Sequence, residues 1–437
     1  MLKAGFARVD ITPPLGSYIS GYFNARYAKG VLDPIQLNAL AFSDGKETDL
    51  IIIADLIGVD RITCDALREE IAAATGVKKD HIMLTALHQH TSYAFLDMHF
   101  KKARGEQILP TDAAYCAMLH LRYCDVAKMA LDDMRDATLG FASEETAEQI
   151  AFIRRYYMKD GTVATNPFNR EHEIDRMCEP ADNTVRLLRF KREGANDIAF
   201  VNFCTHPDVI GGEYLSADWP GFVRRYVEKD LEGVSCLLLN GVQGDSNHID
   251  FINKNMPKSY EHSAHMGRVI ADVVLKLWDK TSVEDAPRVD GAIEVVINQT
   301  RTEGAERYDE CCQFLADYHA GRLSYKPTGA ELGRAGRITR LRTAPAFQQI
   351  PVTVLRLGKF SFVGFGGEPF THYAVAVREA CPDVTVISAC CCNGYEGYLP
   401  TAKALTEGGY EANSSPFTPT LEADCVAAAV KLINELK

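Results

Sequence analysis

The stretch from residue 51 to residue 92 constrains the fold more than any other part of the sequence. Two short apolar runs, residues 51–55 and 81–85, have the length and composition of buried parallel strands. Between them, residues 63–76 have the apolar spacing of a helix and end on a glycine, a common helix stop. The stretch therefore predicts a β-α-β unit, in which a helix joins two parallel strands.

The second of these strands runs directly into the triplet His88-Gln89-His90. In open α/β sheets, binding and catalytic groups gather beyond the carboxyl ends of the strands. If the strand pleat continues through the triplet, both imidazoles point to the same face of the sheet. A single histidine is usually an ordinary polar residue, but two at a strand end are a candidate for metal binding or acid–base chemistry.

Strand-like and helix-like segments alternate along the rest of the chain, which predicts an α/β fold with mixed or parallel sheets flanked by helices. The predicted helices are residues 112–136, 219–230, 260–278, 305–320, 370–380 and 423–436. The predicted strands are residues 199–204, 235–239, 291–298, 349–357, 360–364 and 385–388. Arginine and glycine are frequent in residues 321–343, which predicts a linker or an excursion. Because polar motifs come from the first, middle and last parts of the chain, we expect one domain over residues 1–437.

Composition narrows the function classes. Hydrophobic residues make up 46% and charged residues 24% of the 437 residues, a globular profile. The net charge of −12 and the lack of a basic stripe argue against a nucleic-acid partner. We therefore expect a small-molecule substrate, and a homo-oligomer is possible. No apolar stretch reaches the about 20 residues that span a bilayer, and the start lacks a signal-peptide core, so we expect a cytoplasmic protein without membrane insertion. The thirteen cysteines, three of them consecutive at 390–392, predict reduced thiols.

Four further polar clusters follow predicted strands. In the first, residues 202–208, a strand ends on His206 and Pro207. The second, residues 239–248, is a glycine-containing loop that carries Asp245, Ser246 and His248. In the third, residues 363–370, Glu368 follows three glycines and precedes a predicted helix. The fourth, residues 392–400, carries tyrosines, with Tyr410 and Glu411 downstream.

Each cluster also has an ordinary structural explanation. Glu368 would favour the positive end of the helix that follows it, and Asp245 would cap a turn. Taken together, however, two strand-end histidines and a carboxylate match a catalytic zinc site of the His₂Glu kind, which keeps one position open for water. The joint occurrence of these residues favours the functional interpretation.

With these motifs assembled, the sequence resembles the catalytic domain of the neutral (non-lysosomal, alkaline) ceramidase family. The similarity keeps its order over nearly the whole chain. The matching segments are Gly5-Phe6-Ala7-Arg8-Val9-Asp10-Ile11-Thr12-Pro13-Pro14, Gly21-Tyr22, Leu87-His88-Gln89-His90-Thr91-Ser92, Phe152-Ile153-Arg154-Arg155, Thr205-His206-Pro207, Val242-Gln243-Gly244-Asp245-Ser246-Asn247, Gly367-Glu368, Tyr395-Glu396-Gly397-Tyr398 and Tyr410-Glu411.

The resemblance implies a zinc ion and assigns its ligands and the residues that face the substrate. The implied zinc ligands are His88, His206, Glu368 and Tyr398, with Tyr395 as the other tyrosine that would reach the metal. The implied substrate-facing residues are His90, Arg154 and Tyr410. Either Ser246 or Asp245 takes the place of the family's loop serine.

Two departures from the family change the expected substrate. Ceramidases carry a further C-terminal β-sandwich domain and are usually secreted or membrane-associated, whereas this sequence matches the catalytic region alone and shows neither signal nor anchor. At Thr91-Ser92-Tyr93 the family's glycine is missing, which alters the pocket entrance. We therefore expect a small polar amide or ester rather than ceramide.

The expected chemistry is zinc-assisted hydrolysis. His90 would move the proton, Tyr410 and Arg154 would stabilise the oxyanion or grip a substrate carboxylate, and Asp245 would orient a ligand imidazole. Two alternatives stay open. One is a metal-free serine hydrolase that uses Ser246 with His248 or His90, and the other is a non-catalytic protein that binds a sugar or metabolite.

Overall fold

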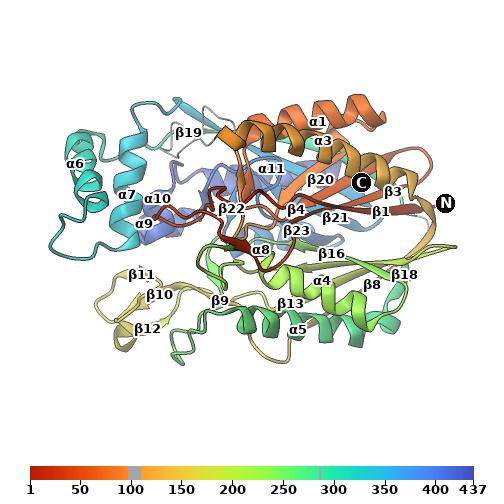
Figure 1. Cartoon of the computed structure of the whole chain (residues 1–437), viewed down its shortest axis with the longest axis horizontal. Helices are drawn as coiled ribbons and strands as arrows, with labels where there is room; N and C mark the ends of the chain where they lie inside the picture. Colours follow the sequence, from red (N-terminus) through yellow and green to blue (C-terminus); the bar gives the residue numbers. More distant parts are fainter. Residues whose placement is uncertain (97–109, 285–286) are drawn as a thin grey trace.

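The computed structural model describes residues 1–96, 110–284 and 287–437, and it contains two main β-sheets covered by helices (Figure 1). This arrangement confirms the predicted α/β fold. The larger sheet has nine strands, in the order β16 (Val234–Asn240), β14 (Asp197–Phe203), β13 (Thr184–Arg192), β8 (Arg135–Glu145), β1 (Lys3–Asp10), β3 (Gln36–Ser43), β4 (Thr48–Ala54) and β6 (Ile82–Ala86), with β18 (Ser282–Glu284) paired to β8. The smaller sheet has the order β19 (Val289–Gln299), β20 (Phe347–Leu357), β21 (Phe360–Phe365) and β23 (Thr385–Ala389).

Three parallel strand pairs, each with a crossover helix, position the site. They are β4 and β6 with α1 (Arg61–Thr75), β14 and β16 with α4 (Asp218–Asp230), and β21 and β23 with α8 (Thr371–Ala380). Their carboxyl ends meet, because the Cys391 carbonyl accepts from Ala86 N at 3.3 Å and the Asn240 carbonyl accepts from Cys390 N at 3.2 Å. The β-α-β unit predicted for residues 51–92 is the first of these three pairs and is confirmed.

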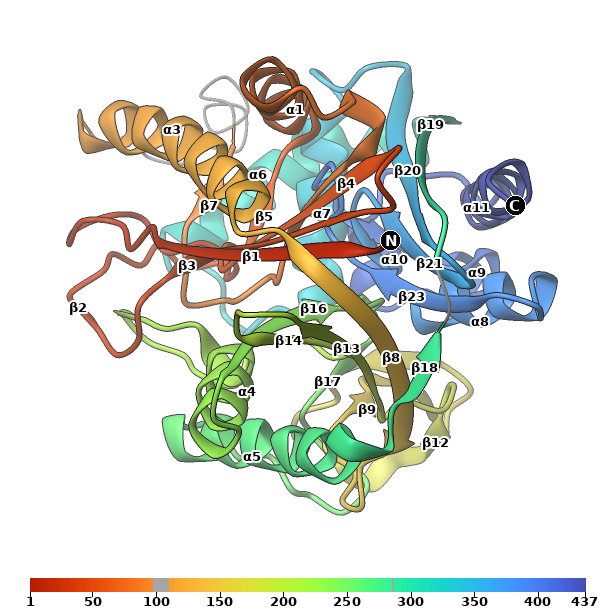
Figure 2. The ribbon, with the colours of Figure 1, turned by 90° about the vertical axis from the view of Figure 1, so that its right-hand side faces the viewer.

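Helix pairs cover the sheets on three sides (Figure 2). The pairs are α1 with α3 (Pro110–Asp132), α4 with α5 (Tyr260–Leu277), and α8 with α11 (Leu421–Glu435). Helix α1 shows why the local sequence folds in this way. The Asp60 side chain accepts from Thr63 N at its start, and Gly76 ends it with a φ of 77°, a left-handed conformation that favours glycine.

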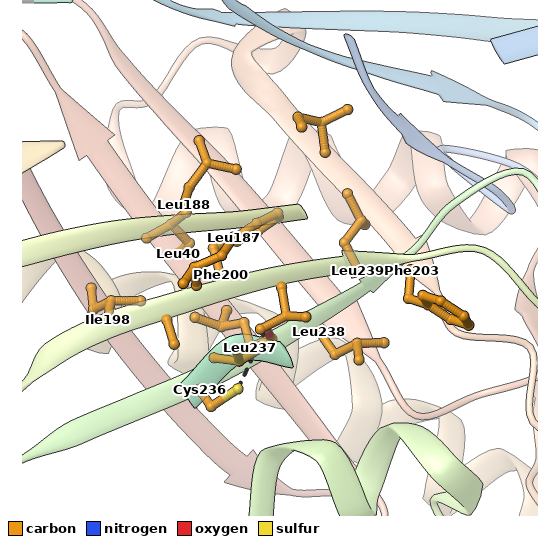
Figure 3. Packing of buried hydrophobic residues seen from close by; sticks show 14 of the residues in the cluster. Leu40, Leu187, Leu188, Ile198, Phe200, Phe203, Cys236, Leu237, Leu238 and Leu239 are labelled. Carbon is orange, nitrogen blue, oxygen red and sulfur yellow. Dashed lines mark hydrogen bonds between the residues drawn. The ribbon is translucent and has the colours of Figure 1, made fainter. Parts of the chain in front are cut away.

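The core between the two sheets is built from strand residues that the sequence marks as apolar (Figure 3). Phe362 of the smaller sheet contacts two phenylalanines of the larger sheet, with ring centroids 5.9 Å from Phe42 and 5.3 Å from Phe200. All three rings are fully buried. Burial of such large rings stabilises the packing of the two sheets on each other.

Short strands and helices surround the carboxyl ends of the parallel pairs. The short strand pairs are β22 (Glu368–Pro369) with β24 (Tyr398–Leu399), β17 (Ser246–Asn247) with β9 (Phe152–Ile153), β5 (Gly58–Val59) with β7 (Ala94–Phe95), and β15 (Tyr214–Leu215) with β2 (Gly30–Val31). A three-stranded sheet has the order β11 (Val163–Thr165), β10 (Arg155–Met158) and β12 (Ile174–Met177). The helices of this region are α6 (Tyr308–His319), α7 (Gly329–Arg340), α9 (Ala402–Glu407) and α10 (Tyr410–Ser414).

The predicted elements agree with the structure to within three residues at each end, with one exception. The helix predicted for residues 112–136 ends at Asp132, because Arg135 already belongs to β8. Within residues 321–343, predicted as a linker or excursion, α7 forms a capped helix that packs on α6 and α10. No disulfide forms among the thirteen cysteines, all of which are described. The single domain over residues 1–437 stays a prediction.

No helix in the described part of the chain has both the length and the apolar character needed to cross a bilayer.

A buried charged cluster lies at the amino ends of β4 and β6, away from the strand ends that carry the site. His81 Nδ1 lies 2.6 Å from Asp49 Oδ1, and His81 Nε2 lies 3.9 Å from carboxylate oxygens of Glu47 and Asp290. Burial raises the pKa of Asp49 to about 7. Burial of His81 acts to lower its pKa, but the carboxylates, Asp49 foremost, raise it above the ordinary value overall. Both groups therefore hold protons more tightly in the folded state than in the unfolded chain.

This cluster predicts a pH-dependent stability. A histidine with a raised folded pKa stabilises the protein below its unfolded pKa of about 6.5, and this stabilisation is lost as the pH rises through the folded pKa. We expect the free energy of unfolding to fall by about 1 kcal/mol between about pH 6 and about pH 8, and to fall less in Asp49→Asn. Urea unfolding at both pH values measures it. Equal pH slopes in the wild type and the variant would contradict the expectation.

Candidate metal centre

The His88-Gln89-His90 triplet lies just beyond β6, but not as a continuation of its pleat. Strand β6 ends at Ala86, and His88 has a φ of 75°, in the left-handed region. The prediction that the pleat aligns the two imidazoles is therefore wrong. The chain turns at His88 instead, and this turn still brings the two rings together, with centroids 5.1 Å apart.

His206 joins this pair from the end of β14. Its ring centroid lies 4.9 Å from that of His88 and 5.5 Å from that of His90. One ring nitrogen of each histidine lies within 4.8 Å of the others, and the three residues are only 1%, 7% and 0% exposed in chain order. This buried group could hold a metal ion.

Glu368 reaches the histidines through a tight glycine-rich turn after β21. A Cβ on Gly367 would lie 2.5 Å from the Gly397 carbonyl oxygen, and one on Gly366 would lie 2.4 Å from the Pro351 ring, so only glycine fits at either position. The turn places one carboxylate oxygen of Glu368, Oε2, against two histidine nitrogens. It lies 3.2 Å from His88 Nε2 and 3.3 Å from His206 Nε2.

The hydrogen bonds of the two rings indicate what occupies the space between these atoms. His88 Nδ1 lies 2.7 Å from the Ile57 carbonyl oxygen, and His206 Nδ1 lies 2.9 Å from that of Gln243. A carbonyl oxygen only accepts, so each Nδ1 carries the proton and each neutral ring turns its Nε2 lone pair toward Glu368. Neither His206 Nε2 nor Glu368 Oε2 has a hydrogen-bond partner among the described residues. Three converging lone pairs repel one another unless a cation lies between them, so these residues fit a metal.

The pKa values of both His206 and Glu368 are lowered in the site. Burial, with a further contribution from Arg154, lowers the pKa of His206. Burial opposes ionisation of Glu368, but His88 and His206 outweigh it and hold its pKa well below the usual range. An ionised carboxylate and an unprotonated imidazole are the forms in which these two groups bind metals.

Two tyrosines lie beside the candidate ligands. Tyr398 pairs with Glu368 in the β22–β24 ladder, and its ring stacks on His206 with centroids 6.5 Å apart. Tyr395 instead lies against His88, with centroids 5.5 Å apart. Paired residues of parallel strands point to the same face, so the ladder favours Tyr398 over Tyr395 as the tyrosine beside Glu368.

His90 differs from the other two histidines. Neither of its ring nitrogens has a hydrogen-bond partner among the described residues, and burial lowers its pKa well below the ordinary value. The Tyr22 ring lies 5.0 Å from its centroid. An unprotonated imidazole with both nitrogens available can transfer protons or serve as a further metal ligand.

Arg154 and Tyr410 both lie against Tyr398. The Arg154 guanidinium lies 5.4 Å from the Tyr398 ring centroid, and the Tyr410 ring is 5.4 Å from that of Tyr398. Arg154 Nε is 2.8 Å from the carboxylate of fully buried Glu411, and Arg154 Nη2 donates to the Gly244 carbonyl oxygen at 2.8 Å. Because two of its three nitrogens are engaged, Arg154 is poorly suited to grip a substrate carboxylate with two hydrogen bonds.

The loop candidates have structural partners. Asp245 Oδ1 accepts from the backbone and the hydroxyl of Thr371 at the start of α8, while backbone carbonyls, not Asp245, hold the two imidazoles. The Ser246 hydroxyl donates to the Gln243 carbonyl oxygen at 3.5 Å. The nitrogens of His248 lie 3.0 Å from the Pro257 carbonyl oxygen and 3.3 Å from Asp208. In the described part of the chain, Ser246 thus forms no hydrogen bond with a histidine.

Three residues near the site were absent from the predicted set. Glu411 neutralises Arg154, Asp208 pairs with His248, and Tyr22 covers His90. Each stands in or directly beside a motif that the sequence already marked, next to Tyr410, after His206-Pro207 and after Gly21. All three could therefore have been predicted as site residues from their position in or next to a site motif.

Comparison with known proteins identifies solved structures with the same fold. No protein-family model and no curated protein sequence matches this chain. Among solved structures, a ceramidase complexed with C2 matches with a TM-score of 0.75 and 15% identity, over 99% of this chain and 75% of that one. Neutral ceramidase from Pseudomonas aeruginosa matches with a TM-score of 0.71 and 15% identity, over 99% and 74%. The chain therefore has the fold of the neutral ceramidases, which confirms the resemblance of its motifs at the level of the fold.

Proposed function

We propose that this protein is a zinc-dependent hydrolase that cleaves an amide or ester bond of a small polar substrate. The observation that carries the proposal is the convergence of three lone-pair atoms, His88 Nε2, His206 Nε2 and Glu368 Oε2, in a buried site of this fold. The two similar structures are ceramidases, which supports the reaction class. We further propose that the protein acts in the cytoplasm, without nucleic acid or membrane insertion, and that it forms a homo-oligomer.

Four residues of the site are the proposed zinc ligands. His88, His206 and Glu368 would hold the zinc ion, with Tyr398 as the fourth ligand. Bound there, zinc would act as a Lewis acid that activates a water molecule and polarises the scissile carbonyl.

The remaining residues would manage the proton and the developing charge. His90 has both nitrogens available, so it would take the proton of the attacking water and return it to the leaving amine or alcohol. Tyr410 and Arg154 lie together beside Tyr398 and would stabilise the oxyanion. Glu411 holds Arg154 in place for this role.

A panel of short N-acyl amides, esters and lactones, with an N-acyl sphingoid base included, tests the function. We expect turnover of short polar members that exhaustive chelation abolishes and zinc restores. Ser246→Ala should keep the zinc-dependent turnover. Full activity after chelation would favour the serine hydrolase, and no turnover with tight metabolite binding would favour the binding protein; either result contradicts the proposal.

A further inference from the structure

A hairpin from the first part of the chain packs directly on His90. Residues 17–28 pair through Ile19 N to the Arg26 carbonyl oxygen and Ala28 N to that of Ser17, both at 2.9 Å. Gly21, near the tip, has a φ of 107°, and a Cβ there would lie 2.7 Å from His90 Nδ1. The hairpin therefore touches the imidazole closely.

Arg26 fastens this hairpin to the site. Its Nη2 donates to the carbonyl oxygens of Ser20 at 2.7 Å and of His90 at 2.8 Å, and its Nη1 donates to that of Gly212 at 3.0 Å. These three carbonyls belong to the hairpin, to the turn after β6 and to the loop that follows His206. One guanidinium thus joins three segments that are far apart in the sequence.

The free-energy cost of burying the Arg26 charge indicates that this residue has a function besides packing. Arg26 is only 8% exposed, and within the described ranges no carboxylate forms an ion pair with it. Burial accordingly lowers its pKa. A buried charge without a counter-ion is expensive, and an apolar residue of similar size usually packs at lower cost.

Arg26 also contacts the Tyr22 ring, which lies against His90. Its guanidinium carbon lies 4.2 Å from the Tyr22 ring centroid, a cation–π contact, and Lys258 donates to the Tyr22 hydroxyl at 2.8 Å. The Tyr22 ring in turn lies 5.0 Å from the His90 ring. The backbone of His90 is held at both ends, because its N–H donates to the Pro207 carbonyl oxygen at 3.1 Å and its carbonyl accepts from Arg26.

The imidazole of His90 has no hydrogen bonds of its own among the described residues. We propose that Arg26 is a positioning residue that holds the His90 ring in the orientation needed for proton transfer, a role that rests on the proposed hydrolase function. Arg26 contacts the backbone of His90 and the face of the Tyr22 ring, and it does not contact the groups proposed to react. Lysine would not replace it, because one ammonium group lacks the planar fork that bonds several carbonyls at fixed angles.

The test compares Arg26→Met and Arg26→Lys with a matched control. Arg192 is also 8% exposed and also donates to backbone carbonyls, those of Asn196, Ala4 and Asp133, away from the site. It differs from Arg26 in that it also forms an ion pair with the Asp133 carboxylate, so it controls for burial and carbonyl bonding and not for the missing counter-ion. We expect both Arg26 variants to lower kcat by about tenfold to a hundredfold, with KM within about twofold and zinc content unchanged. Arg192→Met should keep the wild-type kcat, and added guanidinium should restore part of the activity of Arg26→Ala.

A second readout does not depend on activity. In the zinc-loaded protein labelled with ¹⁵N-histidine, the ring signals of His90, assigned by their loss in His90→Gln, should move or broaden in Arg26→Met and stay in place in Arg192→Met. Unchanged His90 signals, or equal loss of kcat in Arg26→Met and Arg192→Met, would overturn the proposal. If the wild type hydrolyses no member of the panel, the hydrolase function fails, while the His90 signals still decide whether Arg26 positions the ring.

Discussion

Replacement of His206 by alanine is expected to remove the bound metal and to lower turnover about a thousandfold, since a catalytic metal supplies several kcal/mol of transition-state stabilisation. His206 is fully buried, and its Nε2 lies 3.3 Å from Glu368 Oε2, so no water-exposed group can take its place. Elemental analysis of the purified protein measures the metal content, and the zinc-dependent substrate of the panel measures turnover.

A histidine on the surface provides the matched control. The side chain of His172 is 72% exposed, and His172→Ala should keep both the metal and the activity. A His206→Ala protein that folds and retains a full equivalent of metal would contradict the ligand assignment.

The Glu411→Gln substitution is expected to destabilise the protein by about 3–5 kcal/mol, the usual cost of removing one partner of a buried ion pair. Glu411 is fully buried, lies 2.8 Å from Arg154 Nε and 3.6 Å from Arg155 Nη1, and accepts from the Thr165 hydroxyl at 2.6 Å. Glutamine keeps the shape but removes the charge that balances the arginines. Urea unfolding measures the free energy of unfolding.

A double variant separates loss of the pair from loss of packing. In Arg154→Met/Glu411→Leu both charges disappear and apolar groups of similar volume replace them, so we expect a smaller loss of stability than in Glu411→Gln. Turnover should fall in both proteins, because neither presents an oriented Arg154. A loss below about 1 kcal/mol in Glu411→Gln would show that Glu411 does not balance Arg154.

The parallel strand pairs could be predicted from the sequence because their strands are buried on both faces. Such strands read as continuous apolar runs, as in β4 and β16, and the helix between two of them has its own periodicity. The antiparallel strands β1, β8 and β13 were not predicted as strands. Strand β8 mixes buried, half-buried and exposed residues in no regular order and bends along its length between β13 and β1, so its sequence carries no clear period (Figure 2).

The residues of the site could be predicted more readily than their geometry. Strand ends marked His88 and His206, and the glycine-rich turn marked Glu368. The left-handed turn at His88 could not be predicted, since histidine rarely adopts it and only the tertiary structure imposes it. The pairing of Arg154 with Glu411 likewise joins residues far apart in the chain. Local patterns carry no information on such contacts.

In the proposed site, His88, His206 and Glu368 bind a zinc ion while His90 remains free to move protons. Anomalous X-ray scattering at the zinc edge, from crystals of the purified protein, tests it most directly. We predict one strong peak about 2.0–2.2 Å from His88 Nε2, His206 Nε2 and a Glu368 carboxylate oxygen. The absence of a peak at this position, or a peak bonded to His90 in place of Glu368, would contradict this ligand assignment.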